Sequence, residues 1–136
     1  MSRDTTVLVL SGIGNSGPQH WQTLWQRRHP QWQRVNLGDW DRPVCDDWVC
    51  ALDVAVRACP SPPMLIAHSL ACLLVAHWAH RSVLLPKGAF LVAVPDPQSA
   101  SFPAKAHGFA PVPMRPHGFP SIVVASANDP FGSSAF

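Results

Sequence analysis

The sequence predicts an α/β fold in three layers, with a parallel sheet covered by helices on both faces. Short apolar runs, typical of buried strands, alternate along the chain with segments whose apolar residues recur at helical spacing. Strands that alternate with helices form parallel sheets whose two faces are both covered. No internal repeat or linker interrupts the alternation, so we expect a single domain over residues 1–136.

The first half of the chain predicts two strands and two helices. Residues 7–10 are apolar and β-branched, which predicts a buried strand, and a glycine-rich loop follows them. We expect the first helix to start at Pro18, because proline suits a first helical position. A second strand is expected at residues 34–37. The second helix should start at Asp46 or Asp47, since apolar residues then recur every three or four positions.

The second half predicts three further strands, one helix and a long connection. Residues 64–67 form an apolar strand, and the helix expected at residues 71–79 is apolar on all sides and should be buried. Residues 89–94 and 122–125 are the other strands. Between them, residues 95–120 are rich in proline and glycine and predict an irregular crossover of the kind that often covers a site.

Composition excludes several classes of protein. Hydrophobic residues make up 47% and charged residues 13%, which argues against disorder, and the net charge of +2 disfavours a nucleic-acid partner. The N-terminus does not resemble a signal peptide, and no apolar stretch is long enough for a membrane span. We therefore expect a cytoplasmic protein without a membrane partner, whose four cysteines are small core residues.

The glycine-rich loop at residues 12–17 allows three interpretations. It matches G-x-G-x-x-G directly after a strand, and Asp39 follows the second strand where a ribose-binding acid would lie, so a dinucleotide site is one hypothesis. Against it, Pro18 delays the helix that should meet the pyrophosphate. Alternatively, the glycines bring backbone N–H groups close to a reacting carbonyl, or the loop is a turn without chemistry.

Ser69 lies at a predicted strand-to-helix turn within Ala67-His68-Ser69-Leu70-Ala71. The form small-x-Ser-x-small between a strand and a helix is typical of a nucleophile elbow. The N–H of Leu70 would then be an oxyanion donor at the start of the helix. The alternative is that Ser69 only caps the helix. His68 is expected to shape the pocket wall rather than to act as a base.

Asp129 follows the last predicted strand, where a serine nucleophile's orienting acid is expected. In α/β-hydrolases the chain order is serine, acid, histidine. The alternative interpretation is an Asx-type turn before Pro130.

Taken together, these segments resemble the small α/β-hydrolase-type serine hydrolase family typified by retinoblastoma-binding protein nine. The matching pieces are Gly12-Ile13-Gly14-Asn15-Ser16-Gly17-Pro18, His20-Trp21, Asp39-Trp40-Asp41-Arg42-Pro43, Trp48, Ala67-His68-Ser69-Leu70, Phe109-Ala110-Pro111, Pro120-Ser121 and Asp129-Pro130. The resemblance implies an α/β-hydrolase-like fold, with Ser69 as nucleophile, Asp129 as acid and oxyanion donors at Leu70 and near Ile13. Gly14, Asn15 and His68 are possible pocket residues.

Two departures from the family pattern matter. Ala71 stands where relatives usually have glycine, and Asn128 where many have a second aspartate. The family also continues past the acid through a helix, a strand and a Gly-His loop that supplies the base, whereas this sequence ends at Phe136. We therefore expect a fold that lacks the last helix and strand, and impaired hydrolysis.

Seven histidines are candidates for a replacement base: His20, His29, His68, His77, His80, His107 and His117. None matches the family's base position. His77 and His80 are expected to point away from the turn as cations near a helix C-terminus rather than as metal ligands. Phe102, Phe109 and Phe119 in the crossover line an apolar acyl pocket or belong to the core.

The sequence thus predicts a serine hydrolase that acts on a small ester or amide substrate and needs no cofactor or metal. A non-catalytic binding or interaction protein that retains the fold is the alternative. A dinucleotide-binding domain is the lesser one.

Overall fold

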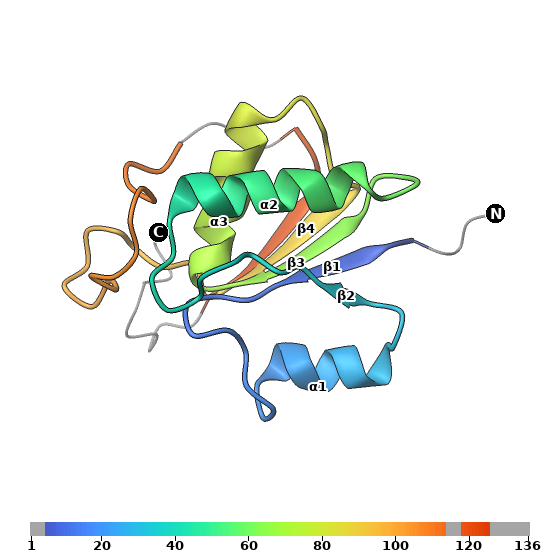
Figure 1. The fold of residues 1–136 in the computed structure, drawn as a ribbon, viewed down its shortest axis with the longest axis horizontal. Helices are drawn as coiled ribbons and strands as arrows, with labels where there is room; N and C mark the ends of the chain where they lie inside the picture. Colours follow the sequence, from blue (N-terminus) through green and yellow to red (C-terminus); the bar gives the residue numbers. More distant parts are fainter. Residues whose placement is uncertain (1–4, 114–117, 126–136) are drawn as a thin grey trace.

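The computed structural model describes residues 5–113 and 118–125, which form a five-stranded sheet between helices (Figure 1). The strand order is β2-β1-β3-β4-β5, and every neighbouring pair is parallel. The strands are β1 (Val7–Leu10), β2 (Gln33–Arg34), β3 (Met64–His68), β4 (Gly88–Val92) and β5 (Ser121–Val124), and the helices are α1 (Trp21–Arg28), α2 (Cys45–Arg57) and α3 (Leu70–Arg81). α1 lies on one face of the sheet, and α2 and α3 lie on the other. The predicted three-layer α/β fold is confirmed.

Side chains that alternate along the strands divide between two layers. Leu65 and Ala67 belong to the main core, which α2 and α3 cover. Phe90 points to the other face, where its ring lies against Trp21 and Trp25 of α1. The helix predicted to be buried on all sides is α3, whose residues 70–75 are all buried.

The start of α1 differs from the prediction. The helix begins at Trp21 rather than Pro18, because the imidazole of His20 caps it: its Nδ1 accepts a hydrogen bond from the N–H of Gln22 at 3.2 Å. Proline has a suitable φ for a first turn, but the capping contact decides where the turn starts.

Two other boundaries shift by a few residues. β2 pairs with β1 only at Gln33 and Arg34, and after Val35 donates to Val9 the chain leaves the sheet, so the strand expected at residues 34–37 is shorter and earlier. α2 begins at Cys45, just before the acidic residues that were expected to start it.

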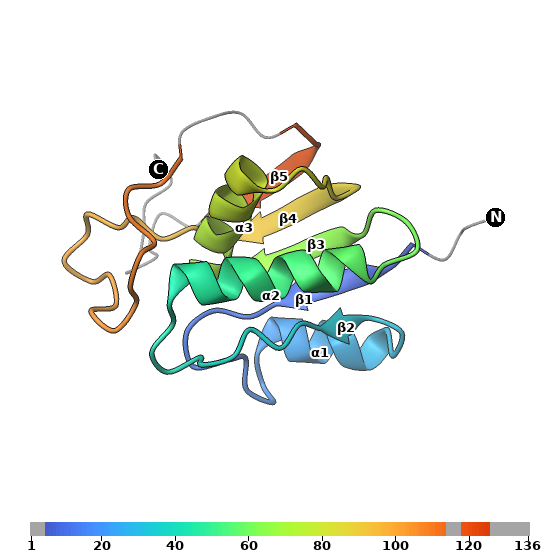
Figure 2. The same ribbon diagram turned by 45° about the horizontal axis from the view of Figure 1, so that its top comes forward.

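The carboxyl ends of the parallel strands meet at one edge of the sheet, and the crossover that follows β4 lies beside that edge (Figure 2). Its described residues contain no helix or strand of their own. Several contacts fix it: the N–H of His107 donates to the carbonyl of Pro43, the N–H of Cys45 donates to the carbonyl of His107, and Phe109 is buried in the core. The predicted irregular crossover is confirmed over its described residues.

All four cysteines are free thiols, and their burial differs. Cys45 and Cys72 are buried and Cys59 is partly buried, whereas Cys50 is exposed, so the core prediction was wrong for Cys50. Within the described part of the chain, no helix has both the length and the apolar character that a membrane span requires.

Candidate active site

Ser69 lies at the sharp turn between β3 and α3. Its φ is 56° and its ψ is −123°, a combination that a non-glycine residue rarely adopts. Backbone hydrogen bonds on both sides hold the turn: the N–H of Ser69 donates to the carbonyl of Val92 at 2.8 Å, and the N–H of Cys72 donates to the carbonyl of Ser69 at 2.8 Å. This is the strained strand-turn-helix context that exposes a nucleophile.

The helix-capping interpretation of Ser69 is not supported. Ser69 occupies the N-cap position of α3, but its side chain makes no capping hydrogen bond. A capping serine normally has an extended backbone and accepts from the second or third helical N–H. Helix capping therefore does not account for the serine at this position.

Cys72 is a second nucleophilic side chain close to this turn, but its thiol is buried and hydrogen-bonded. Its thiol is buried and donates to the carbonyls of Ala67 and Val92. Burial raises the pKa of the Cys72 thiol far above its ordinary value, so the thiolate does not form near neutral pH. Ser69, by contrast, is partly exposed.

The turn is crowded by small residues. Ala67 and Ala71, two positions before and after Ser69, are both completely buried. Gly12 approaches from the glycine-rich loop: a Cβ at this position would lie 3.0 Å from the carbonyl oxygen of His68 and 3.2 Å from the Cβ of Ser69. The loop after β1 therefore contacts the turn after β3 only because residue 12 has no side chain.

Hydrogen bonds already engage three amides of the glycine-rich loop. The N–H of Gly14 donates to the carbonyl of Trp40 at 2.8 Å, that of Asn15 to the carbonyl of Gly12 at 3.0 Å, and that of Ser16 to the Asn15 side chain at 2.9 Å. The loop amide predicted as an oxyanion donor belongs to Ile13, which precedes these three. The loop accordingly has a fixed shape in which Gly14 and Asn15 adopt positive φ values.

His68 is held on the α1 side of the sheet. Its Nδ1 accepts a hydrogen bond from the indole N–H of Trp21 at 3.2 Å, and its ring meets that of His20 edge-on at 4.4 Å between centroids. Burial and then the nearby charge of Arg34 lower the pKa of His20, which favours the neutral imidazole. His68 therefore packs among aromatic rings beside the turn.

Asp129, the predicted acid, lies outside the described residues, as do His117 and Asn128.

A family model described as serine hydrolase matches residues 7–136. The chain belongs to the serine hydrolase family.

Two solved structures have the same fold as this serine hydrolase. One is a protein of Pectobacterium atrosepticum described as a YdeN-like hydrolase, with 30% identity and a TM-score of 0.82. The match covers 96% of this chain and 68% of that one. The other is the ydeN gene product of B. subtilis, with 19% identity, a TM-score of 0.74 and coverage of 97% and 76%, a likeness that concerns the fold. No curated protein matches the chain.

The dinucleotide hypothesis for the glycine-rich loop finds no support in this serine hydrolase. α1 begins four residues after Gly17, so the loop does not open the helix as a pyrophosphate site requires. The carboxylate of Asp39 accepts hydrogen bonds from the N–H groups of Arg42 and Asp41, which lower its pKa and close a local turn.

His77 and His80 lie in the second half of α3. His77 was expected to be a cation near the end of its helix, but it is buried, and its Nε2 lies 2.8 Å from the carbonyl oxygen of Phe109. His80 is exposed on the last turn of α3, as expected. Within residues 5–113 and 118–125, no three histidine, cysteine, aspartate or glutamate side chains are grouped as metal ligands.

All three crossover phenylalanines pack against the core, as the core interpretation expects. Phe109 is completely buried, with its ring edge-on to Trp48 at 5.6 Å between centroids. Phe102 and Phe119 are partly buried against the same core.

Sequence reasoning missed two residues near the site. Gly12 was noted only as part of a motif, although its place directly after a strand was a signal for close packing. Gln22 is buried beneath the loop, with 1% of its surface exposed. Nothing in the sequence marks this glutamine, because polar residues on a short helix normally face solvent.

Proposed function

We propose that this serine hydrolase uses Ser69 as its nucleophile to hydrolyse ester or amide bonds of small molecules. The observation that carries the proposal is the backbone of Ser69: a positive φ at a strand-to-helix turn, with Gly12 packed against it. Such strain persists only where the surrounding structure enforces it, and it is characteristic of functional turns.

In the proposed reaction, the Ser69 oxygen attacks the substrate carbonyl carbon while a general base takes the hydroxyl proton. The negative charge that develops on the carbonyl oxygen is stabilised by the N–H groups of Leu70 and Ile13. Leu70 is the first residue of α3, where amides have no acceptor within the helix. In the complete family mechanism the protonated base gives its proton to the leaving group, and the base then takes a proton from the water that attacks the acyl carbon and returns it to the Ser69 oxygen. Asp129 is the residue we propose to orient such a base.

We further propose that turnover is slow. Three of the described histidines already have hydrogen-bond partners: His68 pairs with Trp21, His20 with the backbone of Gln22, and His77 with the crossover. Loss of the base in such enzymes lowers turnover by several orders of magnitude, and what remains comes from the oxyanion donors and from binding.

Covalent labelling by a fluorophosphonate, detected by intact mass, tests the proposal without requiring turnover. Wild-type protein should gain one label, and Ser69→Ala should gain none. Ser61→Ala is the matched control, because Ser61 is exposed in the loop between α2 and β3. A folded wild-type protein that stays unlabelled, or a Ser69→Ala variant that labels equally, would exclude Ser69 as the nucleophile and favour a non-catalytic binding protein.

A further inference from the structure

A buried glutamine connects the two loops that form the candidate site. Gln22 lies in the first turn of α1 with 1% of its surface exposed, whereas Leu24 and Trp25 of the same helix are 42% and 41% exposed. This inverts the usual arrangement, in which an amphipathic helix buries its apolar residues. A buried amide needs hydrogen-bond partners, so its contacts indicate its purpose.

The Gln22 amide contacts both strands that lead into the site. Its Nε2 donates to the carbonyl of Leu10 at 2.9 Å and to the carbonyl of Ile66 at 3.1 Å. Leu10 is the last residue of β1 and precedes the Gly12 loop by two positions, and Ile66 precedes Ser69 by three. Both protons of the amide are thereby used to hold β1 and β3 together just before the loops that follow them.

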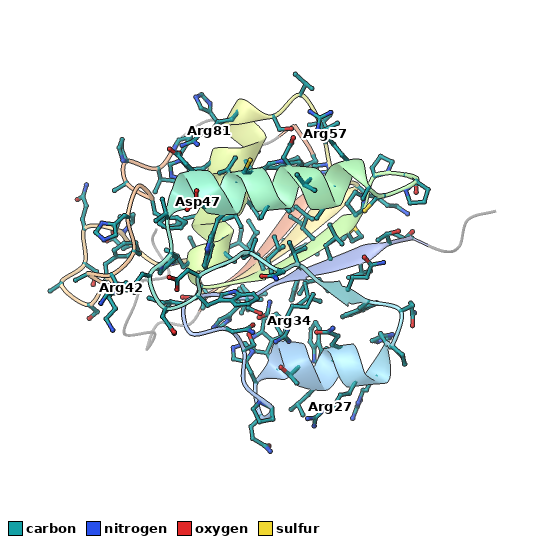
Figure 3. The ribbon with its side chains drawn as sticks, viewed as in Figure 1. Arg27, Arg34, Arg42, Asp47, Arg57 and Arg81 are labelled. Carbon is teal, nitrogen blue, oxygen red and sulfur yellow. The ribbon has the colours of Figure 1, made fainter. Side chains whose placement is uncertain are left out.

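The other end of the amide holds the glycine-rich loop. The hydroxyl of Ser16, itself buried, donates to the Oε1 of Gln22 at 2.6 Å. The carbonyl of Ser16 accepts from Thr23 at 3.1 Å and from Arg34 at 2.9 Å, with Arg34 lying between α1 and the sheet (Figure 3). The loop is therefore clamped at Ser16 and at the end of β1.

We infer that Gln22 is a positioning residue, which sets the distance between the glycine-rich loop and the Ser69 turn and so forms the oxyanion site. This inference rests on the proposed function for its catalytic meaning. The required precision is high: Gly12 reaches the turn with no space for a methyl group, and small misplacements of reacting groups cost orders of magnitude in rate.

Two variants of Gln22 separate shape from hydrogen bonding. Gln22→Met keeps the approximate volume and removes all three hydrogen bonds, and Gln22→Glu keeps the shape but turns an acceptor oxygen toward the carbonyls of Leu10 and Ile66. Gln19→Met and Gln19→Glu are the controls, because Gln19 is exposed just before the same helix. Ser16→Ala is a milder variant that removes one hydroxyl, should Gln22 variants fail to fold.

The first measurement is the second-order rate of fluorophosphonate labelling at Ser69. We expect Gln22→Met to label about 10- to 100-fold more slowly than wild type, Gln22→Glu to be at least as slow, and both Gln19 variants to label at the wild-type rate. A folded Gln22→Met that labels at the wild-type rate would overturn the inference.

The second measurement does not depend on Ser69 chemistry. Amide hydrogen exchange should accelerate at Gly14 and Ser69 in Gln22→Met, while Ala58 at the far end of α2 exchanges as in wild type. Equal acceleration at all three amides would mean that Gln22 only stabilises the fold. If wild type is not labelled at all, the proposed function fails, and the exchange pattern still decides whether Gln22 couples the loops.

Discussion

At residue 12, the space for a single carbon atom decides whether two loops can meet. A Cβ there would lie 3.0 Å from the backbone oxygen of His68, which has little freedom to move. Gly17, at the other end of the loop, has no atom within 4 Å of the corresponding point. Close packing therefore requires a glycine at residue 12 but not at residue 17.

We expect Gly12→Ala to lower the rate of Ser69 labelling by about tenfold or more, because the loop must withdraw from the turn. Gly17→Ala should label at the wild-type rate. Labelling kinetics at matched concentrations of folded protein measure both, and equal rates in the two variants would show that the Gly12 contact is not needed.

At the scale of elements, Asp53 joins α2 to α3. Its carboxylate accepts hydrogen bonds from the hydroxyl of Ser82 at 2.6 Å, from the indole of Trp78 at 2.9 Å and from Arg57 of its own helix at 2.9 Å. The bond from Ser82 is the largest cause that lowers the pKa of Asp53 below its ordinary value, followed by those from Trp78 and Arg57. The ionised form is therefore the one that holds the two helices together.

We expect Asp53→Asn to lower the free energy of unfolding by about 1–3 kcal/mol at pH 7, the usual cost of weakening hydrogen bonds to a charged group. A depressed pKa contributes stability above the unfolded value of about 3.9 and loses it as pH falls through the folded value. The difference between wild type and variant should therefore shrink below about pH 4. Urea unfolding at pH 7, 5 and 3 measures this.

The control for the Asp53 experiment is Asp41→Asn, which changes an exposed carboxylate in a loop. We expect it to alter stability little at any of the three pH values. A gap between wild type and Asp53→Asn that stays constant from pH 7 to pH 3 would contradict the linkage.

At the scale of the whole molecule, the β5 side of the sheet carries exposed apolar residues. Within residues 5–113 and 118–125, β5 is the outermost strand on that side, and its residues Ile122 and Val123, which point to opposite faces, are 64% and 57% exposed. The strand has no charged residue of the kind that commonly protects an edge from pairing with another chain. Exposed apolar surface along an unpaired edge favours self-association.

We expect the protein to associate with increasing concentration, and Ile122→Lys to reduce that association. Val54→Lys is the control, because Val54 is 65% exposed but lies on α2, away from any sheet edge. Sedimentation velocity over a range of concentrations measures the effect. Equal association of wild type and Ile122→Lys would show that β5 is not the contact.

Local patterns in the sequence were sufficient to predict the elements and the turn that carries Ser69. Apolar runs and helical periodicity depend on neighbouring residues, so β1, β3 and α3 were found close to their observed bounds. The start of α1 was missed because the imidazole of His20 caps the helix at that point. The length of β2 was missed because β2 pairs with β1 at only two residues.

The sequence by itself determined the fold class, the family and the candidate nucleophile. Each of these can be predicted from short motifs and from patterns of neighbouring residues. Only the tertiary structure decided that Gly12 packs against Ser69, that His77 is buried against the crossover, and that Gln22 joins β1 to β3. These contacts join residues 12 to 57 positions apart, and a pattern of neighbours along the chain does not encode which distant atoms meet.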